Sequence, residues 1–165
     1  ALDAVAAHFA ERARACGADV SLAFALPERL PLPETDFCMA MANLLENAVE
    51  ACERAERGEG GAGERGSTAQ DGARPLFVDA EARIEGNAVL VSVRNSCTPS
   101  DARALAAAAP DGVLSSDARS AKREGDGIGL ASVATLAKRY RGEVQVEIDE
   151  YAATIRVLLR TGGAR

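Results

Sequence analysis

Residues 41–52 of the 165-residue chain read MANLLENAVEAC, and this stretch predicts a helix with two different faces. Leu44 and Ala48 belong to an apolar stripe at helical spacing, whereas Asn43 and Asn47 project together from another side of the helix. Carboxamide oxygens are hard, neutral ligands, and a Mg²⁺ ion that carries a triphosphate takes one or two protein oxygens and several waters. The residues alone leave two interpretations open, a magnesium site and an ordinary solvated helix face.

A second stretch, GDGIGLASVATLAKRY at residues 125–140, places three glycines directly before a run with helical spacing. Gly125, Gly127 and Gly129 need a reason, because glycine lowers helix stability relative to alanine. The first turn of a helix offers unpaired N–H groups, and the missing side chains let a phosphate approach the backbone. The spacing matches neither a Walker nor a Rossmann loop, so an anion site and a tight turn both remain open.

The rest of the chain predicts an α+β fold. Helical periodicity precedes and follows the strand-like runs, and the turn at 85–87 favours a hairpin. We expect a two-layer α/β sandwich, in which a mixed, mostly antiparallel sheet carries its helices on one face. The expected helices run from Leu2 to Cys16, from Phe37 to Cys52 with Thr35 or Asp36 as the cap, and, after the three glycines, through Leu130 and Tyr140 until Gly142 ends the last one. The expected strands are 20–26, 76–84, 88–93, 144–148 and 154–159.

Two long polar segments interrupt this pattern. Residues 57–75 are glycine-rich and charged, and they predict a flexible surface loop rather than a phosphate loop, because no GK[ST] follows the glycines. Residues 96–124 contain two prolines and lie directly before the glycine cluster, so they predict a mobile lid. We expect weak order in both segments when no ligand is bound.

Composition narrows the class of protein. The net charge of −6 argues against a nucleic-acid interface, and no apolar run is long enough to span a membrane. Four cysteines without a CxxC pair favour reduced thiols in a cytosolic protein. Residues 1–165 are expected to form one domain, and the absence of an initiator methionine predicts that it belongs to a longer protein.

The two motifs occur in the order found in the GHKL family of ATP-binding domains, which includes sensor histidine kinases, gyrase, Hsp90 and MutL. NLLENAVEA at 43–51 resembles the asparagine box of histidine kinases, and GDGIGLASV at 125–133 resembles their second glycine box. The resemblance covers roughly residues 1–160. It implies the Bergerat ATPase fold, a long ATP lid at 96–124, and ATP and Mg²⁺ as cofactors.

The resemblance also implies roles for single residues. Asn47 matches the magnesium-binding asparagine, and Asn43 matches the first polar residue of the same box, so these two are the expected catalytic positions. Lys122 lies where related kinases often have a lid lysine, although a solvated charge is the alternative. The expected ATP-binding residues are Asn43, Asn47, Asn95, Lys122, Gly125, Gly127, Ile128, Gly129 and Leu130.

One motif departs from the family pattern. Most members carry a DxGxG box whose aspartate receives the adenine amino group, but here the strand ends VSVRNSCTPS at residues 91–100. Asn95 occupies the place of that aspartate, and its side-chain oxygen is able to accept the same hydrogen bond. This arrangement resembles the branch of histidine kinases that includes AgrC-like quorum-sensing receptors.

The asparagine at position 43 favours a kinase over a hydrolase. Hydrolytic members have a glutamate there that activates water, and an amide cannot take a proton at neutral pH. Phosphoryl transfer to an imidazole needs only positioning and charge neutralisation. The expected function is the catalytic domain of a sensor histidine kinase; the alternatives are an anti-sigma-factor serine kinase and a degenerate module used only for docking.

The phosphoacceptor is expected on a separate part of the protein. His8 is the only histidine, and it lacks the acidic or arginine neighbour seen beside phosphoacceptor histidines. The resemblance implies an acceptor on a dimerising helical hairpin, a sensor region outside this chain and a response regulator downstream. The isolated domain is expected to be a cytoplasmic monomer, and the full-length parent a membrane-anchored homodimer.

Overall fold

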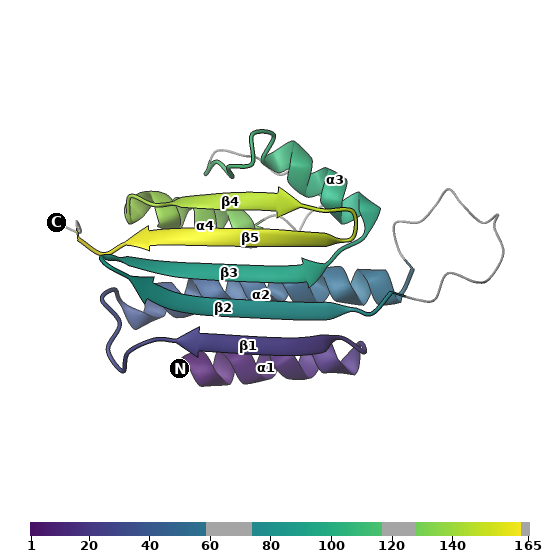
Figure 1. Cartoon of the computed structure of the whole chain (residues 1–165), viewed down its shortest axis with the longest axis horizontal. Coiled ribbons are helices and arrows are strands. Elements are labelled where there is room, and N and C mark those ends of the chain that lie inside the picture. The colour runs from purple at the N-terminus through teal and green to yellow at the C-terminus, as the bar shows by residue number, and fades with distance from the viewer. Residues whose placement is uncertain (59–73, 117–127, 163–165) are drawn as a thin grey trace.

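The computed structural model describes residues 1–58, 74–116 and 128–162, and Figure 1 shows a sheet with helices behind it. No helix in these ranges is long and apolar enough to cross a membrane. In chain order the elements are α1 (Leu2–Ala15), β1 (Asp19–Ala25), α2 (Glu34–Glu56), β2 (Phe77–Glu85), β3 (Ala88–Ser96), α3 (Pro99–Ala108), α4 (Ile128–Arg139), β4 (Glu143–Ile148) and β5 (Ala152–Arg160).

The five strands form one mixed sheet with the order β1-β2-β3-β5-β4. Strand β1 runs parallel to β2, and the other neighbours pair antiparallel. Helix α2 runs behind the middle of the sheet and α4 behind β4 and β5 (Figure 1). The predicted α+β class, with a mostly antiparallel sheet and its helices on one face, is therefore confirmed.

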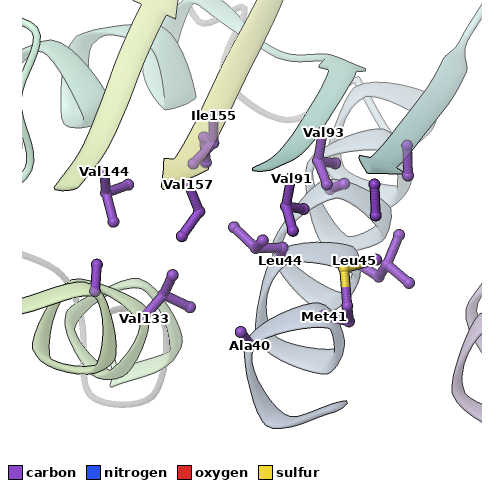
Figure 2. Close-up of a cluster of buried hydrophobic side chains, with 14 of the residues drawn as sticks. Ala40, Met41, Leu44, Leu45, Val91, Val93, Val133, Val144, Ile155 and Val157 are labelled. Atoms are coloured by element: carbon purple, nitrogen blue, oxygen red, sulfur yellow. The ribbon is translucent and has the colours of Figure 1, made fainter. Parts of the chain in front are cut away.

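The core lies between the sheet and its helices. Strand β3 buries alternate side chains, because successive residues of a strand point to opposite faces. Figure 2 shows Leu44 and Leu45 of α2 beneath Val91 and Val93 of β3, and Val133 of α4 facing the β4 side of the sheet. All five of these side chains are at most 2% exposed. This packing fixes α2 and α4 on the sheet and so fixes the positions of their other faces.

Helix α2 begins earlier than the sequence predicted. Its first residue is Glu34, after Pro33, whose φ of −54° suits a helix start, and no side chain caps it. Asp36 therefore does not cap the helix. Its carboxylate instead accepts a hydrogen bond from the Tyr140 hydroxyl at 2.6 Å and one from Arg139 at 3.3 Å. These contacts tie the end of α4 to the start of α2.

The segment expected to be a lid contains a helix that the sequence analysis did not predict. Helix α3 begins with a capping box between Thr98 and Asp101 and has proline in its first turn. After it, the backbone N–H of Leu114 donates to Val144 at 2.8 Å, so this part of the chain extends the β4 edge. Residues 117–127, like residues 59–73 of the predicted loop, lie outside the described ranges. The lid and the flexible loop stay predictions.

Candidate functional site

One side of α2 carries the polar residues singled out in the sequence, and neighbouring helices meet it at three points. The polar residues on this side of α2 are Asp36, Asn43, Asn47, Glu50 and Arg54. At 100° per residue, they fall within about 60° of one another around the helix axis. Asp36 is bonded to the end of α4, as described above, and Arg54 pairs with Asp101 of α3 at 3.0 Å. This side of α2, the polar stripe, therefore faces the space between α3 and α4.

The third contact joins the two sequence motifs. A Cβ atom added at Gly129 would lie 3.4 Å from the side-chain oxygen of Asn43 and 3.5 Å from its Cβ. The start of α4 therefore lies directly against the Asn43 amide, and only hydrogen atoms of glycine face it. Asn47 follows one turn later on the same stripe, and both asparagines are half-buried. The structure thus brings the asparagine helix and the first turn of α4 together.

Asn95 supplies a buried acceptor at the end of β3. The residue is 2% exposed, and its amide nitrogen donates to the Ser96 carbonyl at 2.9 Å. Among the described residues, its side-chain oxygen is the buried side-chain atom that has no hydrogen-bond partner. The opposite amide orientation would place that oxygen against the Ser96 carbonyl, so the assigned orientation is the favourable one. An unpaired buried acceptor costs about 1–3 kcal/mol, and a ligand N–H group is able to satisfy it.

A second contact places Asn95 along the length of α2. The Cys52 thiol donates to the Phe77 carbonyl at 3.4 Å and lies 3.9 Å from the same Ser96 carbonyl that holds Asn95. Cys52 is nine residues beyond Asn43 in α2, a separation of roughly 13 Å along the helix axis. An extended nucleoside triphosphate is therefore long enough to reach from the Asn95 side-chain oxygen to the Asn43–Gly129 contact.

The structure describes only some of the remaining residues that were predicted for the site. Lys122, Gly125 and Gly127 lie outside the described ranges. Ile128 is the first residue of α4, and Leu130 packs, half-buried, against the core. Arg54 of the polar stripe and its partner Asp101 on α3 were not singled out by the sequence analysis. The available signals were the spacing of three and then four residues from Asn47 through Glu50 to Arg54, and the Thr98-x-x-Asp101 capping pattern.

The oxygen donors of the stripe suit a magnesium ion that keeps most of its waters. The described part of the chain contains no cluster of three histidine, cysteine, aspartate or glutamate side chains that would enclose a metal ion. Asn43 and Asn47 instead offer two neutral amide oxygens on one helix face. A small number of protein oxygens is what Mg²⁺ takes when it binds together with phosphates. The donor set therefore fits a magnesium–nucleotide complex better than a bare metal.

Residues 33–162 match the family described as histidine kinase-, DNA gyrase B- and HSP90-like ATPase. The chain belongs to this ATPase family. Its structure is similar to the nucleotide-free catalytic domain of histidine kinase ThkA, with 18% identity over 97% of this chain and 90% of that one, and a TM-score of 0.63. No curated protein is significantly similar to this ATPase domain in sequence.

Two further histidine kinases are similar to the ATPase domain. One, from Burkholderia phymatum, is 17% identical over 98% of this chain and 68% of that chain, with a TM-score of 0.60. Full-length ShkA in complex with AMPPNP is 22% identical over 99% of this chain and 30% of that chain, with a TM-score of 0.54. At these identities the similarity shows the fold alone.

Proposed function

We propose that this domain binds Mg-ATP and transfers the γ-phosphoryl group to a histidine on a separate dimerisation domain. It would thus be the catalytic part of a two-component sensor histidine kinase. The observation that carries the proposal is the contact between Asn43 and Gly129, because it joins a pair of oxygen donors to a helix start that favours phosphate. The likeness in fold to histidine kinase catalytic domains supports the same conclusion.

We propose separate tasks for the two ends of the site. The unpaired oxygen of Asn95 would accept the adenine amino group, which accounts for the absent DxGxG box and agrees with the AgrC-like branch. Gly125, Gly127 and Gly129 would present backbone N–H groups to the phosphates, together with Lys122. Asn47 would hold Mg²⁺, with Asn43 beside it. When bound, the ion neutralises charge on the transferring phosphoryl group.

The stripe favours transfer to a histidine over hydrolysis of ATP. Asn43 has no basic group for activating water at neutral pH, whereas an imidazole acceptor needs none. We place the acceptor on another domain, because His8 lies exposed on α1. Helix α1 contacts α2 through the Arg12–Glu53 ion pair, about 100° around α2 from the polar stripe. We propose that a response regulator receives the phosphoryl group and that the isolated domain is a monomer.

Calorimetry with Mg-ATP tests the binding step. The parent domain should bind, and Asn47→Ala should weaken binding about tenfold or more, because it removes a metal ligand. Asn87→Ala is the matched control, since Asn87 lies in the β2–β3 turn and its contact to Thr161 uses the backbone carbonyl. An absence of binding by the parent, or equal binding by Asn47→Ala, would refute the proposed site. An absence of binding by the parent would favour a docking module, whereas equal binding by Asn47→Ala would place the nucleotide elsewhere on the domain.

Transfer of the γ-phosphoryl group needs its own experiment. The domain is incubated with γ-labelled ATP and a separate helical hairpin that carries the proposed acceptor histidine. Label on a histidine of that hairpin, lost in Asn47→Ala, is the expected result. ATP binding without transfer would retain the nucleotide site and overturn the histidine-kinase assignment.

A further inference from the structure

We infer that Arg54 is a positioning residue of the nucleotide site. Through Asp101 it holds the junction between β3 and α3 on helix α2, and it thereby restrains the segment that follows Asn95 relative to Asn47. This inference rests on the proposed function, because it concerns how the Asn95 end and the Asn47 end of the proposed nucleotide site are held relative to each other. Arg54 itself is not expected to touch the nucleotide.

The pair has the geometry of a specific contact. Arg54 Nε donates to Asp101 Oδ1 at 3.0 Å, and the two side chains are only 20% and 11% exposed. A second guanidinium nitrogen lies 3.9 Å from Glu50, one turn earlier on the polar stripe. Because the pair is largely desolvated, removing one partner leaves the other charge without its counterpart.

The second carboxylate oxygen of Asp101 extends this link toward β3. It accepts hydrogen bonds from the Thr98 hydroxyl at 2.8 Å and from the Thr98 backbone N–H at 3.3 Å. Thr98 follows Asn95 by three residues, at the point where the chain leaves the sheet. One carboxylate thus connects a side chain of α2 to the chain that carries the buried acceptor.

The opposite end of the link lies on the same stripe as the metal-binding candidate. Arg54 follows Asn47 by seven residues, roughly 10 Å along the helix axis. Helix α3 packs chiefly on β4, and its backbone makes little contact with α2. In the described part of the chain, the ion pair therefore joins two helices that otherwise approach each other little. Its loss should let the β3–α3 junction shift relative to Asn47.

Three variants test the inference by calorimetry. Arg54→Met removes the guanidinium. Asp101→Asn breaks the pair but keeps an oxygen for Thr98, so the cap of α3 is retained. The double variant reports coupling. Arg12→Met is the matched control, because the Arg12–Glu53 pair at 3.1 Å is also half-buried but joins α1 to α2.

The expected result is a loss of affinity that is specific to a ligand that bridges both ends of the site. Arg54→Met and Asp101→Asn should each raise the Kd for Mg-ATP about tenfold, since small displacements of binding groups are costly. The double variant should be no worse than Arg54→Met. Adenosine and magnesium tripolyphosphate each use only one end of the site, so the affinity of the variants for either ligand should fall less than about threefold. Arg12→Met should leave all three affinities unchanged.

Several outcomes would overturn the inference. Unchanged Mg-ATP affinity in a folded Arg54→Met or Asp101→Asn variant would remove the positioning role while leaving the proposed function intact. A loss in Arg54→Met that is absent in Asp101→Asn would mean that Arg54 contacts the ligand directly. An equal loss for adenosine would indicate general destabilisation. A parent domain that does not bind Mg-ATP refutes the proposed function, and this inference fails with it.

Discussion

Replacement of Asn95 by alanine should weaken nucleotide binding without weakening the apo fold. The change eliminates the buried oxygen that has no partner among the described residues, which relieves about 1–3 kcal/mol. It also removes the bond to the Ser96 carbonyl, worth about 1 kcal/mol, but that carbonyl keeps the Cys52 thiol nearby. The lost packing costs about 1 kcal/mol more. These opposing contributions leave the free energy of unfolding within about 1 kcal/mol of the parent.

Urea unfolding and calorimetry measure the two quantities separately. We expect Asn95→Ala to weaken Mg-ATP binding about tenfold or more, because the adenine amino group loses its acceptor. Saturating Mg-ATP should accordingly stabilise the parent by about 2.7 kcal/mol at one hundred times its Kd, and the variant by much less.

Ser96→Ala is the control for the Asn95 variant. The Ser96 hydroxyl accepts a hydrogen bond from the Phe77 backbone N–H at 3.0 Å, so its removal leaves a donor unpaired. Ser96→Ala should therefore be more destabilising than Asn95→Ala. If Asn95→Ala costs more than about 3 kcal/mol, the amide oxygen has a partner after all. If its affinity for Mg-ATP matches that of the parent, adenine is bound elsewhere.

Gly129→Ala should raise the thermal midpoint, because alanine favours the helix by about 0.5–1 kcal/mol and its methyl group would meet Asn43 at ordinary contact distances. The same methyl group covers the amide, so calorimetry should show weaker Mg-ATP binding; a variant that is more stable and binds equally well would exclude Gly129 from the site. Burial, and then the hydrogen bond to Asp36, raise the pKa of Tyr140 to about 12, above its usual value of 10.0. The folded state thus favours the protonated phenol, whose contribution is complete below about pH 10 and is lost as the pH rises toward 12. Tyr140→Phe should flatten this part of a plot of unfolding free energy against pH, and an unchanged slope would contradict the assignment.

Periodicity along the chain predicted most of the secondary structure, because it reflects which face of each element is buried. The boundaries and caps were less predictable. Asp36 is a residue type that often caps helices, but its carboxylate accepts a hydrogen bond from Tyr140, which lies about one hundred residues later in the chain. Helix α3 was missed because its alanine-rich sequence lacks a strong apolar stripe, although the Thr98 capping box was a usable signal.

The sequence by itself determined the α+β class and the presence of two motifs, because both depend on residue type and local spacing. Only the tertiary structure decided that the Asn43 amide meets Gly129 and that the Asn95 oxygen lies buried without a partner among the described residues. It also decided that Arg54 reaches Asp101. These contacts join elements far apart in the chain, and they exist because the apolar faces of α2 and α4 pack on one side of a common sheet.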